Sequence, residues 1–261
     1  FNNGPLFPGL VFGNWVGGDR DGHPLVTAEV TKQTLLALRQ RALDLQRDEV
    51  AKLAASLSVS GEGLTLPHDF NARFEGLVSL CGPLADGAVS RNPGEPFRQF
   101  LNLVSLRIPR STDALHAHHY KSAEELVADL SLVAQALRKI GADRLAHEDV
   151  YSVIQIAHTF GFHLARLDVR QNSVVLERAL GQFVDAGRVL AAPWNAVSET
   201  ERASLIRSEL QHPRPFVAHS QSVGPEGDEI RNLFNVLQSH RRMFGEEGIG
   251  SFIVSMTRSS E

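Results

Sequence analysis

Residues 162–170 read FHLARLDVR, a short aliphatic stretch that interrupts the helical spacing of the sequence around it. Its length and composition are typical of a β-strand in a buried sheet. A second stretch of this kind, SFIVSM, stands at residues 251–256, after a mostly helical segment. Because parallel strands need a crossover between them, the two stretches are expected to be parallel neighbours in an α/β layer or barrel.

Most of the remaining sequence predicts helices. Apolar residues recur at helical spacing from residue 27 to 57, with Thr27 as the expected N-cap. Ser122 and Glu125 match a capping box that opens a helix, and Gly141 is expected to end that helix. A loop is expected over residues 85–96, and further helices over residues 68–80, 96–110, 149–160, 173–183, 198–211 and 225–244.

The fold class is therefore mostly α-helical, with a small α/β part that begins late in the sequence. No internal repeat marks a domain border, so the division is placed where the strand-bearing part begins. We expect residues 1–141 to hold the first loop and a helical region. Residues 142–261 are expected to hold the start of the β/α part.

Composition excludes several classes of protein. The sequence is 43% hydrophobic and 21% charged, and its net charge of −4 gives no electrostatic signature for nucleic acid. No run of about 18 apolar residues is present, and the single cysteine, Cys81, fits a reducing compartment. We expect a cytoplasmic protein without membrane or nucleic-acid partners. Because an apolar strand stands at the end of the sequence, we also expect the chain to be a piece of a longer protein.

A glycine-rich charged loop precedes the first long helix, where residues 17–24 read GGDRDGHP. Glycines let the backbone approach a ligand or another segment closely, and the acids and the arginine can hold one another in place. A capped surface turn is the more common explanation of such a loop taken alone.

Charged residues alternate at the end of the first predicted strand. Arg166, Asp168 and Arg170 stand at i, i+2 and i+4, which places them on one face of a strand. Arg170 is at the carboxyl end, where parallel α/β folds place their ligand sites. Arg170 could bind a phosphate or carboxylate while Asp168 orients it, and a purely structural Arg–Asp pair is the alternative.

Three motifs in this order resemble phosphoenolpyruvate carboxylases. They are FGNWVGGDRDGHPLVT at residues 12–27, FHLARLDVRQNSVVLERAL at residues 162–180 and FIVSMTRSS at residues 252–260. The helices between them resemble the family only in length and helical character. One departure lies in the loop, where His23 stands at a position that is usually Asn in the family. The resemblance implies helices around a parallel β/α barrel of the TIM type, of which this chain would hold the first strands.

The resemblance also implies an activity. Phosphoenolpyruvate carboxylases are lyases that form oxaloacetate and phosphate from phosphoenolpyruvate and bicarbonate, a carbon dioxide fixation that replenishes the tricarboxylic acid cycle. The reaction uses Mg²⁺ or Mn²⁺ and needs cations around the phosphate and a dry apolar slot for carbon dioxide. A cytoplasmic homotetramer is implied for the complete enzyme.

The resemblance assigns roles residue by residue. Arg170 matches the strand-end arginine that grips the phosphate, and Trp15 matches the loop tryptophan beside the apolar slot. The substrate-binding wall would be completed by Arg166, Asp168, Gly17, Gly18, Asp19, Arg20 and Asp21.

Other parts of the family pattern match no residue of this sequence. The catalytic histidine and the metal-binding carboxylates are missing, so the chain alone is expected to be inactive and the metal ligands to lie outside it. His116, His118 and His119 could suggest a metal site, although a polar loop between helices is the more common explanation. Two alternatives stay open, namely a catalytically silent carboxylase-like scaffold for oligomerisation or effector binding, and an unrelated helical binding module.

Overall fold

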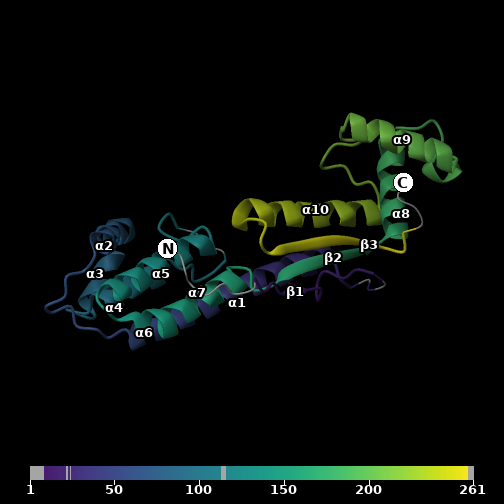
Figure 1. Cartoon of the computed structure of the whole chain (residues 1–261). Helices are drawn as coiled ribbons and strands as arrows, with labels where there is room; N and C mark the ends of the chain where they lie inside the picture. Colours follow the sequence, from purple (N-terminus) through teal and green to yellow (C-terminus); the bar gives the residue numbers. More distant parts are fainter. Residues whose placement is uncertain (1–8, 22, 24, 113–115, 258–261) are drawn as a thin grey trace. The chain divides into compact units, whose positions relative to one another are not determined.

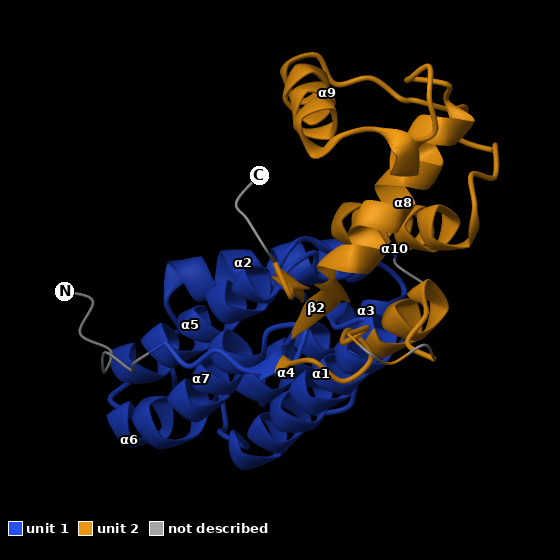
Figure 2. Ribbon diagram, turned by 90° about the vertical axis from the view of Figure 1, so that its right-hand side faces the viewer, with its two compact units in different colours: residues 1–13, 35–166, 244–248 blue, residues 14–34, 167–243, 249–261 orange. Residues whose placement is uncertain are grey.

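The computed structural model describes residues 9–21, 23, 25–112 and 116–257. The chain forms two compact units, each made of segments that are distant in the sequence (Figure 2). Unit 1 takes residues 1–13, 35–166 and 244–248, and unit 2 takes residues 14–34, 167–243 and 249–261. The predicted division into residues 1–141 and 142–261 stays a prediction about the domains of a longer chain.

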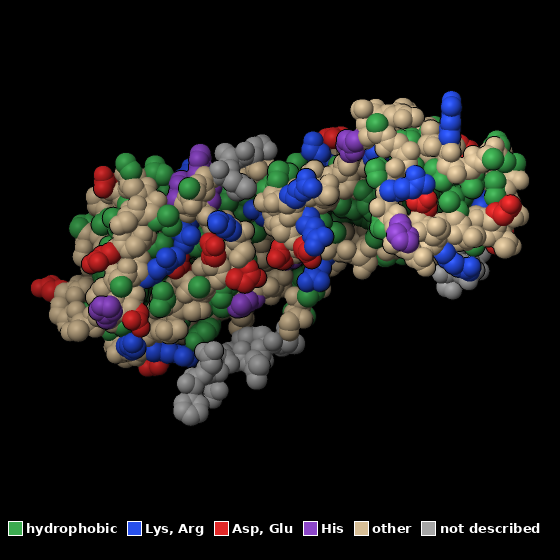
Figure 3. All heavy atoms as spheres, turned by 90° about the horizontal axis from the view of Figure 1, so that it is seen from above, with side chains coloured by type: hydrophobic (Ala, Val, Ile, Leu, Met, Phe, Trp, Pro, Cys, Tyr) green, Lys and Arg blue, Asp and Glu red, His purple; other side chains and the backbone are tan. Residues whose placement is uncertain are grey.

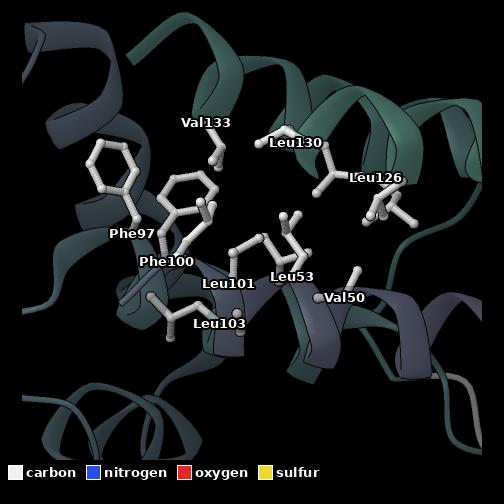
Figure 4. Close-up of a cluster of buried hydrophobic side chains, with 14 of the residues drawn as sticks. Val50, Leu53, Phe97, Phe100, Leu101, Leu103, Leu126, Leu130 and Val133 are labelled. Atoms are coloured by element: carbon white, nitrogen blue, oxygen red, sulfur yellow. The ribbon is translucent and has the colours of Figure 1, made fainter. Parts of the chain in front are cut away.

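Unit 1 is helical (Figure 1). Apolar side chains of the long helix α1 and of helices α4 and α5 meet in its core, among them Val50, Phe100 and Leu130 (Figure 4). Each of these helices has one apolar face, and packing those faces together removes them from water. The helices are α1 (Ala28–Ser56), of which residues 28–34 belong to unit 2, α2 (His68–Cys81), α3 (Leu84–Ser90), α4 (Pro96–Arg107), α5 (Ala123–Lys139), α6 (Asp143–Leu145), a π-helical turn (Ala146–Val150) and α7 (Tyr151–Phe160).

Two predicted features of the helical region are wrong. Residues 84–90 form helix α3 rather than a loop, because Ala85 and Ala88 lie on one face of a helical turn and are buried. Helix α4 ends at Arg107 instead of residue 110, because Ile108 precedes a proline and is held in an extended conformation.

The predicted helix caps have mixed outcomes. The Thr27 hydroxyl accepts a hydrogen bond from the Val30 amide at 3.4 Å, as expected of an N-cap. Gly141 follows α5 with a φ of +81°, also as expected. The capping box predicted at Ser122 is wrong, since its side chain makes no cap hydrogen bond. Its predicted partner, Glu125, lies 3.4 Å from the Arg107 guanidinium instead.

A three-stranded sheet has the order β1-β2-β3, and β2 and β3 are parallel. This confirms that the two aliphatic stretches are parallel neighbours. The strands are β1 (Gly13–Asn14), β2 (Arg166–Asn172) and β3 (Ile249–Ser255). The helices of unit 2 are α8 (Ser173–Ala186), the short 3₁₀ turn Trp194–Ala196, α9 (Glu199–Gln211) and α10 (Pro225–Phe244).

The start predicted for the strand at residues 162–170, which is β2, is wrong. Residues 162–164 belong to a turn that follows α7, in which the Leu164 amide donates to the Phe160 carbonyl at 2.7 Å. Gly161 and Leu164 both have positive φ, at 51° and 65°, so the backbone there cannot be extended. Strand β2 therefore begins at Arg166 and continues past Arg170 to Asn172.

Within β2, burial alternates from residue to residue. Leu167 and Val169 are buried, whereas Arg166, Asp168 and Arg170 are exposed or partly exposed. The three charged residues therefore share one face of the strand, as their spacing predicts.

Basic and acidic side chains are interspersed on the face of the molecule shown in Figure 3. None of the helices in the described ranges is long and apolar enough to cross a membrane.

Candidate active site

The glycine-rich loop lies beside the carboxyl half of β2. The Arg170 amide donates to the Gly18 carbonyl at 3.0 Å, and the Arg20 amide donates to the Arg170 carbonyl at 2.9 Å. Asp19 and Arg170 thus form a parallel bridge, as neighbouring residues in a sheet do. The loop and the strand end therefore meet in one place, although about 150 residues separate them in the sequence.

Two glycines allow this close approach. Gly17 has a φ of +86°, and a Cβ atom added to it would lie 2.0 Å from the Thr34 hydroxyl. A Cβ atom on Gly18 would lie 2.1 Å from the Asp168 carbonyl oxygen, which belongs to the backbone and cannot turn away. Any side chain at Gly18 would push the loop off the strand.

Two loop acids hold the Arg170 guanidinium. The Nη1 atom of Arg170 lies 3.1 Å from Asp19 Oδ2, and its Nη2 atom lies 3.8 Å from Asp21 Oδ2. Hydrogen bonds from Ser255 and Asn172 lower the pKa of Asp21, with a smaller contribution from the Arg170 charge. The Arg170 side chain keeps 39% of its surface exposed. It is therefore oriented and still accessible to an anion.

Arg20 points away from Arg170. Its side chain is buried, and its Nη2 atom donates to Glu229 Oε1 at 2.7 Å. Glu229 belongs to helix α10 and was missed by the sequence analysis. Its segment has the amphipathic pattern of an ordinary helix, so no local signal marks this carboxylate as part of the site.

Asp168 and Arg166 are placed differently from the loop acids. The Asp168 Oδ1 atom accepts a hydrogen bond from the Ser251 amide at 2.8 Å, where the β2–β3 register shifts between Leu167 and Val169. The acids that orient Arg170 are thus Asp19 and Asp21. Arg166 begins β2 with an exposed side chain. The substrate-binding roles of Asp168 and Arg166 stay predictions.

Trp15 begins the tight turn of the loop. Its carbonyl accepts from the amides of Gly18 and Asp19, both at 3.0 Å, and its side chain is 61% exposed. At the other end of the loop, the His23 carbonyl accepts from the Val26 amide at 3.2 Å. The loop residues Gly22 and Pro24 lie outside the described residues.

The rings of His116, His118 and His119 are clustered in unit 1, with centroids 4.5 to 5.5 Å apart. Burial, together with the neighbouring His118 and His116, lowers the pKa of His119 to about 4. In the part of the chain that the structure describes, no group of three or more His, Cys, Asp and Glu side chains is placed to hold a metal ion.

An accessible arginine at the end of a parallel strand, held by two acids of a loop that packs closely against the strand, is an arrangement that can bind an anion in α/β proteins. The sequence places the chain more specifically. It belongs to the phosphoenolpyruvate carboxylase family, whose model matches residues 3–261.

Curated relatives agree with the family model. The phosphoenolpyruvate carboxylase of Rhodopseudomonas palustris (strain BisB5) is 32% identical over 264 residues, which cover 95% of this chain and 27% of the relative. The phosphoenolpyruvate carboxylase of Nostoc sp. (strain PCC 7120) is 30% identical, over 95% of this chain and 25% of the relative. The chain therefore spans about a quarter of the length of these relatives.

Proposed function

We propose that this chain is part of a phosphoenolpyruvate carboxylase that converts phosphoenolpyruvate and bicarbonate into oxaloacetate and phosphate. The observation that carries the proposal is the accessible Arg170 guanidinium, which the family motif assigns to phosphate and which Asp19 and Asp21 orient. The chain covers only 27% of a relative such as the Rhodopseudomonas palustris enzyme. We therefore propose that the activity belongs to a longer protein and that this chain alone is inactive.

In this proposal Arg170 binds the phosphoryl group that bicarbonate attacks. A guanidinium next to that group stabilises the charge that develops on its oxygens. Phosphoryl transfer leaves the enolate of pyruvate and carboxyphosphate, which then breaks its C–O bond to release phosphate and carbon dioxide. The enolate carbon captures this carbon dioxide in an apolar slot, and Trp15 forms part of its wall. The exposed indole of Trp15 supports this role, because it leaves an apolar surface free for contact with substrate or with the rest of the enzyme.

The remaining predicted residues have supporting roles in the same proposal. Gly17 and Gly18 let the loop lie against β2, while Asp19 and Asp21 orient Arg170. Arg20 anchors the loop through Glu229. Arg166 and Asp168 complete the wall as residues on the same face of the strand as Arg170.

The divalent metal, Mg²⁺ or Mn²⁺, does not fit the described residues of this chain, because they form no group of ligands for it. We propose that its ligands belong to other parts of the longer enzyme. The TIM-type barrel, the homotetramer and the cytoplasmic location also remain proposals. The apolar residues Phe252, Ile253 and Val254 of β3 are 36 to 38% exposed. This exposure supports the barrel, because in a barrel a further strand and helix would cover these residues.

Substitution of Arg170 and Trp15 in the full-length enzyme tests the proposal. Arg170→Ala should lower kcat/KM for phosphoenolpyruvate by roughly 100-fold or more, because it removes a charge that the transition state needs. Trp15→Ala should instead raise the share of turnovers that release pyruvate rather than oxaloacetate. Arg178→Ala is the matched control. This arginine of α8 is largely exposed, and its contact with Glu226 is long, at 4.0 Å.

Two results would contradict the proposal. Kinetics of Arg170→Ala like those of the parent would contradict the role of Arg170 in phosphate binding. An unchanged ratio of pyruvate to oxaloacetate in Trp15→Ala would contradict the role of Trp15 in the carbon dioxide slot. A full-length parent without carboxylase activity would favour the catalytically silent scaffold.

A further inference from the structure

One carboxylate oxygen of α10 receives hydrogen bonds from two other segments of unit 2. Glu229 Oε1 accepts from Arg20 Nη2 at 2.7 Å and from the Ala28 amide at 2.6 Å. Ala28 is the first residue of α1, whose initial amides have no partner within the helix. Glu229 therefore joins the loop and the start of α1 to helix α10.

Side chains of the loop alternate between two directions. Asp19 and Asp21 face Arg170 on β2, whereas Arg20 between them faces Glu229. The loop is thus held from both sides, by Arg170 on one and Glu229 on the other. The Arg20 amide also donates to the Arg170 carbonyl, so the residue that reaches Glu229 through its side chain is tied to β2 through its backbone.

Loss of Glu229 would leave two buried donors unsatisfied. The Arg20 side chain is only 4% exposed, and its Nε atom already lacks a hydrogen-bond partner. A buried guanidinium that has lost both its hydrogen-bond acceptor and its counter-charge is strongly unfavourable, so without both the Arg20 side chain would turn toward water. The loop would then leave the strand, and Asp19 would no longer orient Arg170.

We propose that Glu229 is a positioning residue for phosphoenolpyruvate binding, which it serves through Arg20 and the loop without touching the substrate. This proposal rests on the proposed function, because it takes Arg170 as the phosphate ligand. A glutamine at position 229 keeps an amide oxygen that can accept both hydrogen bonds, although it loses the charge. The alanine variant loses both.

The experiment uses the full-length enzyme with Glu229→Ala, Glu229→Gln and the control Glu226→Gln. Glu226 is also on α10, and its partners Gln182 and Arg178 belong to α8. We expect Glu229→Ala to raise KM for phosphoenolpyruvate about 10- to 100-fold with a smaller change in kcat, because a misplaced binding group weakens substrate binding. Glu229→Gln should stay within a few fold of the parent, and so should Glu226→Gln.

A double substitution separates positioning from a general loss of structure. If Glu229 acts through Arg170, adding Glu229→Ala to Arg170→Ala should raise KM no further, since the two residues serve one contact. Additive effects of the two substitutions, an unchanged KM in Glu229→Ala, or an equal defect in Glu226→Gln would each overturn the proposal. If Glu229→Ala does not fold, the same comparison is made with Arg20→Met, which breaks the same contact from the loop side and leaves no cation buried. A KM defect of Arg20→Met that is additive with Arg170→Ala would then overturn the proposal.

Hydrogen exchange tests the same role without depending on activity. In the full-length protein, Glu229→Ala should speed exchange of the Arg20 and Ala28 amides about tenfold or more, while Glu226→Gln leaves them protected. Unchanged protection of both amides would overturn the role of Glu229. A parent that shows no carboxylase activity would overturn the proposed function instead, and the exchange data would still decide how the loop is held.

Discussion

Each unit contains an arginine–carboxylate cluster, and the two clusters differ in exposure. In unit 1, Asp129 is 2% exposed and accepts hydrogen bonds from Arg73 at 2.6 and 2.9 Å, from Arg107 at 3.0 Å and from the Tyr120 hydroxyl at 2.7 Å. In unit 2, Asp19 and Asp21 hold an Arg170 side chain that is 39% exposed. The same chemical groups thus form a closed cluster in one unit and an open one in the other.

Closure decides what each cluster can do. Burial, and next the nearby Asp129 carboxylate, raise the pKa of Tyr120 well above its usual value, so the phenol keeps its proton and donates a hydrogen bond to Asp129. A buried cluster of this kind cannot release a partner without leaving a charge in the core. The ion pairs of the open cluster can separate without leaving a charge in the core, because water solvates the carboxylates and the guanidinium.

Removal of the acid from the closed cluster should have the largest effect on stability. Asp129→Ala leaves Arg73 and Arg107 without their shared counter-charge, so we expect the free energy of unfolding to fall by about 3–5 kcal/mol. Urea unfolding followed by circular dichroism measures it. Asp69→Ala on the surface of α2 is the control and should change little. A loss below about 1 kcal/mol for Asp129→Ala would erase the difference between the clusters.

Gly18→Ala should have the next largest effect and should open the exposed cluster. Its Cβ atom would overlap the Asp168 carbonyl, so the backbone has to move at a cost of about 1–3 kcal/mol. The control is Gly13→Ala, since a Cβ atom at Gly13 meets nothing within 4 Å. Thermal unfolding of both variants provides the comparison. Equal melting temperatures would show that the loop does not need its close approach to β2.

The third prediction concerns pH and the histidines near the closed cluster. The pKa of His119 is lowered to about 4 in the folded state, so below pH 6.5 the unfolded chain binds a proton that the folded chain does not. The contribution of the neutral His119 imidazole to the free energy of unfolding is therefore complete above pH 6.5 and is lost as the pH falls toward about 4. Because solvent screens the imidazole in part, we expect a loss of about 1 kcal/mol.

His119→Gln isolates this contribution. The variant should lose less stability than the parent between pH 7 and pH 5 in urea titrations, since glutamine does not titrate. His68→Gln is the control, because His68 is largely exposed beside Asp69. Identical pH profiles for His119→Gln and the parent would mean that His119 is protonated alike in the folded and unfolded states.

The smallest effect is expected for the open cluster itself. A double-mutant cycle with Asp19→Ala and Arg170→Ala should give a coupling below about 1 kcal/mol that falls as salt is added, because both side chains are partly solvated. The same cycle for Arg107 and Asp129 should give a larger coupling that salt hardly changes. A coupling above about 3 kcal/mol for Asp19 and Arg170 would place the open cluster in the same class as the closed one.

Sequence reasoning found the sheet because the aliphatic stretches at residues 162–170 and 251–256 break the helical period. It misplaced the start of β2 because Leu164 has a positive φ in the turn after α7. An aliphatic residue gives no sequence signal for that backbone conformation. The loop predicted over residues 85–96 was wrong for residues 85–90, which are helical, and right for residues 91–95. Buried alanines stabilise α3 through tertiary packing, which a local reading does not include.

The site was partly predictable for the same reasons. The order of the motifs indicated that the loop and Arg170 belong together, and the glycines indicated a close approach. Glu229 could not be found, because it contacts Arg20 from 209 residues away and its helix has an ordinary amphipathic pattern. The hydrogen bond from Ser251 to Asp168 depends on the register of β3, which the sequence does not specify.

The pairing of the glycine-rich loop with β2 has a consequence for the order in which the chain folds. Asp19 and Arg170 are 151 positions apart, and closing a loop of that length costs about 4 kcal/mol of chain entropy. Helices such as α2, α3 and α4 contact their neighbours in sequence and can assemble as soon as they are made. During synthesis the loop leaves the ribosome before β2 and stays unpaired until β2 follows. Proteolysis of the nascent chain at the loop would therefore report how long the loop remains unpaired with the carboxyl end of β2.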